Sequence, residues 1–162
     1  MLTGAEVGPG FIDDTFTPDN EPTFCGEPSL NQQVPPLRDV GSASSNGVAF
    51  FQEEARAYSS SAEAQKVLDL IKNETACPAP TIPGGGPIQF SAPQDVTDDL
   101  TTPVEEAIEI DFQTEEAQGK FFVIKDTVAI VIFSFAAQQG ADVSQLPVEI
   151  DVVNKGLKKI VG

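Results

Sequence analysis

The sequence predicts an α+β domain, in which an antiparallel β-sheet of four to five strands is backed by two amphipathic helices and joined by a disulfide-tethered N-terminal arm. Three observations support this fold class. Apolar residues within 104–137 alternate with the period of strands, whereas those in 61–76 and 147–160 recur at helical spacing. The two cysteines lie in a Pro/Gly-rich leading segment and at the end of a predicted helix.

Length, composition and charge limit what the chain can do. Its 162 residues suit one domain, 1–162, with a loop-rich arm at 1–46 and a sheet with helices at 47–162. Hydrophobic residues make up 40% of the chain, enough for a single core. The formal net charge of −16 would repel phosphate backbones and anionic lipid head groups. Nucleic acid and membrane surfaces are therefore not expected as partners.

The leading arm is predicted to contain little regular structure. Thr3 and Glu6 have the spacing of a capping box, and a Gly-Pro-Gly sequence would end the resulting helical turn. Five prolines then follow between residues 11 and 47, where only 27–34 has the pattern of another helical turn. A segment this long without regular structure is either functional or fixed to the core.

Residues 47–58 are predicted to form the first strand, and 61–76 the first long helix. The helix starts with the serine and glutamate of a capping box (Ser60, Glu63) and continues with apolar residues at helical spacing. The strand alternates imperfectly between apolar and polar residues. Its polar side would carry Gln52, Glu54 and Arg56.

The second half of the chain contributes most of the predicted sheet. A short strand is expected at 87–92 and a longer one, with alternating apolar and acidic residues, at 104–115. Residues 119–137 indicate a hairpin that turns at Lys125-Asp126. Its second arm, 128–135, is apolar on both sides, which is typical of a central strand covered on both faces.

An amphipathic helix from Pro147 to Ile160 is expected to end the domain. Its apolar residues recur at intervals of four and three, with acids near the start and lysines near the end, as the helix dipole favours. The apolar positions are Leu146, Ile150, Val153, Leu157 and Ile160. We expect both helices to cover one sheet face. The arm, with its three phenylalanines (Phe11, Phe16, Phe24), would cover the other face, together with a ligand or a partner chain.

Cys25 and Cys77 allow several kinds of chemistry. Their spacing excludes a CxxC redox motif, and a chain without histidine supplies poor ligands for zinc. A disulfide is the favoured interpretation, and two unrelated thiols are the alternative. A bridge that closes a loop of about 53 residues would stabilise the fold by about 4 kcal/mol in a chain-entropy treatment. It would also indicate an oxidising compartment.

No catalytic, cofactor-binding or metal-binding motif is recognisable. The absence of histidine excludes Ser-His-Asp and Cys-His arrangements, and no P-loop, GxSxG or GxGxxG pattern occurs. The loop 13–21 is acidic (Asp13, Asp14, Asp19, Glu21) but lacks EF-hand spacing, so we interpret it as solvated rather than calcium-binding. A hydrolase would need two acids facing each other across a cleft. The candidate pairs are Asp98/Asp99, Glu105/Glu106 and Glu115/Glu116.

The sequence as given shows no targeting leader. It starts without a basic segment followed by an apolar run of signal length. The longest apolar segment, 127–137, is about half the length that a bilayer span needs. An exported form would therefore depend on a leader or a membrane anchor outside this sequence.

Four segments carry a resemblance to one group of proteins. LTGAEVGPGF, the block AYSSSAEAQKVLDLIKNETACP, FFVIKDTVAIVIF and the final amphipathic helix follow each other in this order. Together they resemble extracytoplasmic sensor domains and lipoproteins of actinobacteria, including the PknH-type extracellular domains of receptor serine/threonine kinases. The resemblance implies an exported, membrane-anchored domain with a cleft for a cell-envelope ligand. It implies two disulfides in the kinase-linked branch; this chain can form one, which fits the lipoprotein or free-standing branch better.

These observations predict a non-catalytic, extracytoplasmic ligand-binding or sensor domain of a cell-envelope lipoprotein or receptor, without a cofactor. Its partner would be a cell-envelope ligand or another protein. One alternative is a secreted protein–protein interaction domain or homodimer that binds no small molecule. The other is a hydrolase that uses two carboxylates.

Overall fold

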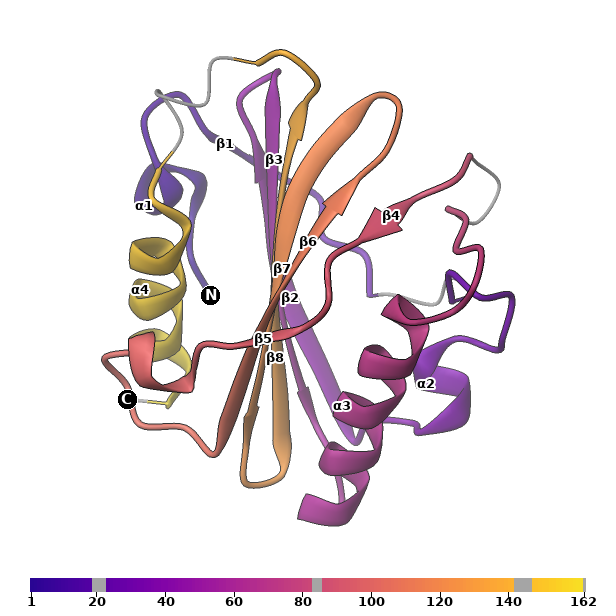
Figure 1. Cartoon of the computed structure of the whole chain (residues 1–162). Coiled ribbons are helices and arrows are strands. Elements are labelled where there is room, and N and C mark those ends of the chain that lie inside the picture. The colour runs from indigo at the N-terminus through magenta and orange to yellow at the C-terminus, as the bar shows by residue number, and fades with distance from the viewer. Residues whose placement is uncertain (19–22, 83–85, 142–146, 162) are drawn as a thin grey trace.

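The computed structural model describes residues 1–18, 23–82, 86–141 and 147–161. They form an eight-stranded antiparallel sheet with helices on both sides (Figure 1). The strand order is β1-β2-β3-β8-β7-β6-β4, and β5 pairs with β6. The α+β class is therefore confirmed, but the sheet has more strands than the predicted four to five.

The elements have the following bounds. The strands are β1 (Ile12–Asp14), β2 (Arg38–Ser45), β3 (Ala49–Ala57), β4 (Gln89–Phe90), β5 (Gln94–Asp95), β6 (Glu106–Gln113), β7 (Ala117–Asp126) and β8 (Ala129–Gln138). The helices are α1 (Gly4–Val7), α2 (Leu30–Gln33), α3 (Ser61–Thr75) and α4 (Glu149–Val161), with a 3-10 turn at Thr97–Asp99. Leu146, predicted as part of the last helix, lies outside the described residues.

The hairpin of β7 and β8 forms the centre of the sheet, as its apolar sequence predicts. β8 pairs with β3 on one side and with β7 on the other. The turn lies later than expected, because β7 runs through Asp126 and Thr127 adopts a left-handed backbone with φ of 47°. Ile130, Val131 and Phe133 of β8 are almost completely buried.

The two long helices lie on opposite faces of the sheet, so the prediction that both cover one face is wrong (Figure 1). Val153 and Leu157 of α4 pack with Phe133 and the alternate residues of the neighbouring strands. Val67 and Leu68 of α3 belong to a second core that includes Ile130 and residues of β6 and β7. Helical periodicity identifies the buried side of a helix, but long-range packing decides which sheet face receives it.

Three strands were not predicted from the sequence: β1, β2 and β5. β2 lies within the segment that was expected to be loop, and its sequence RDVGSASS has few of the β-branched and aromatic residues that favour strands. It forms because β3 offers an edge along its whole length, from Phe50 to Ala57. Tertiary pairing thus overrides weak local propensity.

The arm contributes to both faces rather than covering one. Phe11 belongs to the core beneath α4, whereas Phe24 packs edge-on against Phe90 on the α3 side, with ring centroids 5.1 Å apart. Phe16 occupies the space beside Gly41, where a Cβ atom would lie 2.4 Å from its ring. The prediction for the arm is therefore correct only in part.

The predicted disulfide is present. Cys25 and Cys77, which are 52 positions apart in sequence, are bonded, with their Cα atoms 6.2 Å apart. The bond joins the loop before α2 to the segment that follows α3. Phe24 and the end of α3 are thereby held close together.

Candidate functional site

Two cavities flank one end of the sheet on opposite faces. The larger, here called the α3-side cleft, has a volume of about 750 Å³ and lies between the sheet, the end of α3 and the arm. The smaller, the α4-side pocket, has a volume of about 450 Å³ and lies near the start of α4. Strand register assigns their floors to opposite faces, because neighbouring residues such as Phe112 and Gln113 point in opposite directions.

The floor of the α3-side cleft is a regular grid of side chains from four strands. Alternate residues along each strand share this face. The contributing side chains are Phe50, Gln52 and Glu54 of β3, Ile132, Ser134 and Ala136 of β8, Phe121 and Val123 of β7, and Ile110 and Phe112 of β6.

The cleft exists because α3 covers only half of this face. Ala64, Val67 and Leu68, near the middle of the helix, are fully buried against the sheet. Further along β8, Ile132, Ser134 and Ala136 are only half-buried, although β8 lies at the centre of the sheet. Half-exposed residues on a central strand mark a part of the sheet that no other element of the described ranges covers.

The walls of the cleft are joined covalently. Ile71, Glu74 and Thr75 line it from α3, and Thr23, Phe24 and Leu30 line it from the arm. The disulfide lies immediately beyond Phe24 on one wall and two residues beyond Thr75 on the other. The distance between the walls is therefore restrained by the bond as well as by packing.

Phenylalanine rings form a continuous apolar strip along the cleft. Phe24 contacts Phe90, whose ring centroid lies 6.4 Å from that of Phe121. Phe121 in turn stacks on Phe112 at 4.8 Å. Phe50, on the opposite side of the floor, is 39% exposed, which leaves apolar surface available for contact.

Two polar side chains interrupt this apolar floor. Gln52 and Ser134 are paired across β3 and β8, and both line the cleft. Cross-strand partners of this kind have Cβ atoms about 5 Å apart. Neither side chain makes a hydrogen bond within the described part of the chain, so both can hydrogen-bond to a bound molecule.

A buried charged cluster borders the cleft beyond these residues. Glu54 accepts a hydrogen bond of 2.8 Å from Nε of Arg56, and Nη2 lies 2.8 Å from the same oxygen. Asp39 lies 3.7 Å from the guanidinium. Burial raises the pKa of Glu54 to about 7, although Arg56 opposes the shift. Burial also raises the pKa of the nearby Tyr58 to about 12.

This cluster belongs to the predicted polar side of β3, which the structure buries at Glu54 and Arg56. Glu54 and Arg56 are 2% and 1% exposed. On the other face of β3, Glu53 is also buried and accepts a hydrogen bond of 2.6 Å from the backbone nitrogen of Leu2. Buried charges of this kind are tolerated only with partners, which the sequence could not reveal.

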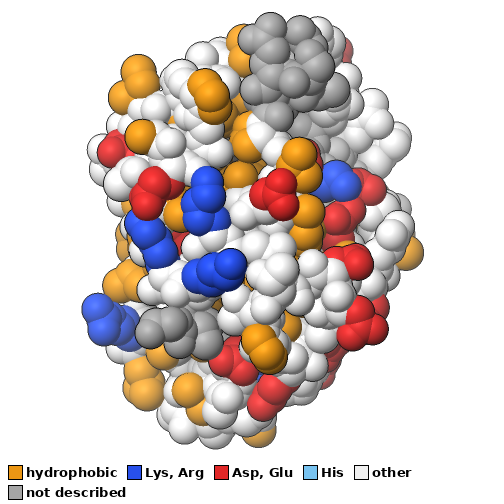
Figure 2. Space-filling view, turned by 90° about the vertical axis from the view of Figure 1, so that its left-hand side faces the viewer, with side chains coloured by type: hydrophobic (Ala, Val, Ile, Leu, Met, Phe, Trp, Pro, Cys, Tyr) orange, Lys and Arg blue, Asp and Glu red, His pale blue; other side chains and the backbone are white. Residues whose placement is uncertain are grey.

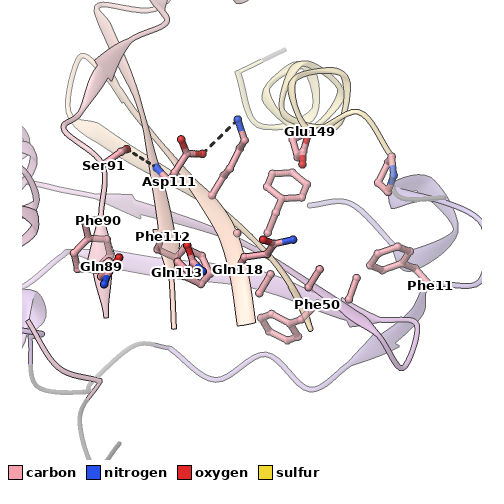
Figure 3. A pocket seen from close by; sticks show the side chains of 17 residues that line it. Phe11, Phe50, Gln89, Phe90, Ser91, Asp111, Phe112, Gln113, Gln118 and Glu149 are labelled. Carbon is pink, nitrogen blue, oxygen red and sulfur yellow. Dashed lines mark hydrogen bonds and ion pairs between the residues drawn. The ribbon is translucent and has the colours of Figure 1, made fainter. Parts of the chain in front are cut away.

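The α4-side pocket has a more polar floor (Figure 3). Gln89, Gln113 and Gln118 lie in one cross-strand row. Nζ of Lys120 lies 2.6 Å from Glu109 and 3.5 Å from Asp111. Burial opposes the charge on Lys120, but its hydrogen bond to Glu109 and the two carboxylates together raise its pKa.

The wall of the α4-side pocket opposite this row comes from the arm and the start of α4. Figure 3 shows Phe11 and Glu149 on that side, away from Gln89 and Phe90. Because Lys120 already has two carboxylate partners, the pocket offers no uncompensated positive charge to an anion.

The acidic pairs proposed for a hydrolase do not form a catalytic arrangement. Asp98, Asp99, Glu115 and Glu116 are exposed. Glu105 pairs with Lys125, and Glu106 with Lys72 at 2.5 Å. The two acids that are buried among the described residues, Glu53 and Glu54, are consecutive in β3 and point to opposite faces.

The acidic loop is described only in part. Oδ1 of Asp13 accepts a hydrogen bond of 2.5 Å from the backbone nitrogen of Gly4. Asp19 and Glu21 lie outside the described residues. Within the ranges that the structure describes, no cluster of three or more potential ligands could hold a metal ion.

Sequence reasoning found the disulfide but missed the polar residues of the cleft. The sequence alone could have pointed to Ser134 as a polar residue of the site, because it is the one hydroxyl in the run from Val128 to Phe135, which is otherwise apolar on both sides. Gln52 was predicted only to lie on the polar side of its strand, and the register with β8 brings it beside Ser134. The open half of the face has no signature in the sequence.

The described residues include no helix with both the length and the apolar character needed to cross a membrane. No protein-family model matches the sequence, and no curated protein sequence is significantly similar to it. The class of the fold is nevertheless clear: an antiparallel sheet with helices on both faces and a disulfide beside a cleft.

A solved structure of the same fold is the crystal structure of the extracellular domain of PknH from Mycobacterium tuberculosis. The two structures superpose with a TM-score of 0.63 over 98% of this chain and 93% of that chain, at 9% sequence identity. The resemblance inferred from the sequence is therefore confirmed at the level of the fold.

Proposed function

We propose that this chain is a non-catalytic extracytoplasmic domain of the sensor type, which binds an apolar ligand in the α3-side cleft. The observation that carries the proposal is the open half of the sheet face, where a central strand is half-exposed among phenylalanines. Leaving this much apolar surface exposed is unfavourable unless another molecule covers it.

Two observations support the location outside the cytoplasm. The Cys25–Cys77 disulfide is of a kind that persists in oxidising compartments. The similar structure is described as an extracellular domain. We also propose that the ligand comes from the cell envelope and that the domain is part of an anchored lipoprotein or receptor, as the sequence resemblance implies.

The absence of a catalytic role is part of the proposal. The acids predicted to act as hydrolase pairs are exposed or paired with lysine, and of the two acids that line the cleft, Glu54 is held by Arg56. A glycosidase-like reaction needs two carboxylates facing one substrate across a cleft. Binding without chemistry is therefore the function that this geometry favours.

Binding of an uncharged apolar dye tests the proposal. N-phenyl-naphthylamine should bind the chain saturably and fluoresce in the cleft. Ser134→Trp places a large ring at the centre of the floor and should abolish this signal. Ser61→Trp, at the exposed start of α3, is the matched control and should bind the dye like the original chain.

Thermal unfolding should be measured on all three proteins, so that loss of binding is not confused with loss of folding. Equal dye binding by the Ser134→Trp and Ser61→Trp proteins would place the dye elsewhere and contradict the proposal. So would a complete lack of binding to the original chain.

A further inference from the structure

We infer that the α3-side cleft selects an uncharged amphiphile, with a hydrocarbon body along the phenylalanine strip and a hydroxyl- or amide-bearing head group at Gln52 and Ser134. This inference rests on the proposed ligand-binding function and specifies its ligand class. Three features of the lining lead to it: its charge, its two polar side chains and the neighbouring buried ion pair.

The charge of the lining disfavours anions. Of the described residues that line the cleft, Glu54 and Glu74 carry acidic groups and none is lysine or arginine. The whole chain adds a formal net charge of −16. A carboxylate or phosphate head would lose its hydration on entering the cleft without gaining a positive partner, which is costly.

Several lysines gather on the other side of the sheet, although α3 also carries Lys66 and Lys72. Figure 2 looks onto the side of α4, where several basic side chains gather. α4 alone contributes Lys155, Lys158 and Lys159. No lysine of either side is among the described residues that line the cleft, so the lining itself lacks a positive partner for an anion.

The floor disfavours a cationic head as well. Glu54 is the carboxylate nearest to Gln52 on this face of β3, about 7 Å away by strand geometry. Its charge is already balanced by Arg56, whose guanidinium is 2.8 Å from its oxygen. Asp39 lies 3.7 Å from the same guanidinium, so a cation above Gln52 would meet carboxylates that Arg56 already holds rather than a free one.

Gln52 and Ser134 fit an uncharged polar head. The amide of Gln52 both donates and accepts hydrogen bonds, and the hydroxyl of Ser134 does the same. They are direct cross-strand neighbours, so one hydroxyl or amide of a ligand can contact both. Around them lie Phe50, Phe112 and Phe121. Their apolar rings favour contact with the hydrocarbon chain of a ligand over contact with its polar groups.

Competition between three amphiphiles with the same twelve-carbon chain tests this inference. Dodecanoylglycerol is uncharged, dodecanoate is an anion and dodecylammonium is a cation. Each is added below its micelle concentration, at mildly alkaline pH, to the chain loaded with N-phenyl-naphthylamine. Dodecanoylglycerol should displace the dye at a concentration about tenfold lower than either charged probe.

Variants separate the head-group site from the hydrocarbon site. The double variant Gln52→Leu/Ser134→Ala should bind dodecanoylglycerol about tenfold more weakly, relative to the affinity of the same protein for the dye. Glu74→Lys should strengthen binding of dodecanoate, because it introduces a positive charge into the wall. Asp69→Lys, on the exposed side of the same helix, makes the same change in charge and should have no such effect.

The possible results distinguish this inference from the proposed function. Equal or stronger displacement by dodecanoate or dodecylammonium, with normal dye binding, would overturn the neutral-ligand inference alone. Unchanged head-group preference in the Gln52→Leu/Ser134→Ala protein would overturn the assignment of these two residues. A chain that binds neither the dye nor any of the amphiphiles would overturn both the inference and the proposed function.

Discussion

The two faces of the sheet are covered to different extents. On the α4 side, Phe133, Val153 and Leu157 are completely buried, and the helix approaches so closely that only a glycine fits at position 156. On the α3 side, the helix covers half of the face and a disulfide fixes its end to the arm. One face is filled by the chain itself, and the other leaves a cleft beside a covalent restraint.

This difference in cover between the two faces shows that a strand with two apolar sides need not be fully packed on both of them. β8 has apolar residues on both sides, but its α4-facing residues are buried while Ile132 and Ala136 remain half-exposed. Apolar surface that stays accessible beside well-packed surface is a usual property of a binding site.

Removal of the disulfide should have the largest effect and should act mainly on the cleft side. We expect the double variant Cys25→Ala/Cys77→Ala to lose about 2–4 kcal/mol of unfolding free energy, measured by urea denaturation. Hydrogen exchange should increase more in residues 70–75 of α3 than in residues 150–157 of α4. An equal increase in both helices would show that the bond restrains the whole domain rather than one wall.

On the α4 side, adding a single methyl group should lower the unfolding free energy. A Cβ atom at Gly156 would lie 2.5 Å from Cε1 of Phe133 and 2.8 Å from Oε1 of Glu53, both in buried side chains. We expect Gly156→Ala to destabilise the chain by about 1–2 kcal/mol, since overpacking outweighs the gain of about 1 kcal/mol in helix propensity.

The matched change on the cleft side is Ser134→Thr, which adds one methyl group to a half-exposed strand position. It should alter the unfolding free energy by less than about 0.5 kcal/mol. Urea denaturation of both variants measures the contrast. If Ser134→Thr destabilises the chain as much as Gly156→Ala does, the α3-side floor is packed and the cleft is closed in solution.

The pH dependence of stability should contain a smaller contribution from Glu54. Burial raises the pKa of this carboxyl from 4.5 to about 7, so between these values the native state holds a proton that the unfolded chain has released. The contribution of Glu54 to stability is therefore greatest at acidic pH and is lost as the pH rises from about 4.5 to about 7.

Glu54→Gln removes this titration, and the unfolding free energy should then fall less steeply with rising pH over the same interval. Urea denaturation at several pH values measures the slope. Glu116→Gln, on an exposed loop, is the control and should leave the slope unchanged. A slope that is the same in all three proteins would mean that Glu54 is ionised in the native state throughout this range.

Local sequence patterns predicted the long elements well. The helices at 61–76 and 147–160, the strands at 47–58 and 104–115 and the central hairpin all occur close to their expected positions. Each has a clear period and recognisable ends; for example, the side chain of Ser60 caps α3 by accepting a hydrogen bond from the nitrogen of Glu63. The short strands β1, β2 and β5 lack such a pattern and form only because a longer strand provides an edge.

The candidate site was much less predictable. The cysteine pair was accessible to sequence reasoning, because few chemistries suit two distant cysteines in a chain without histidine. The pairing of Gln52 with Ser134 depends on the register between β3 and β8, which residues 82 positions apart in sequence establish together. No local pattern contains that information.

The sequence by itself determined which segments are helices or strands, which cysteines can pair and which catalytic motifs are missing, because each of these depends on neighbouring residues or on composition. Only the tertiary structure decided that the two helices take opposite faces, that Glu54 and Arg56 are buried, and that half of one face stays open. The physical reason is that burial depends on how much sheet area a helix covers. Helix length and placement set that area, and contacts between distant segments fix the placement.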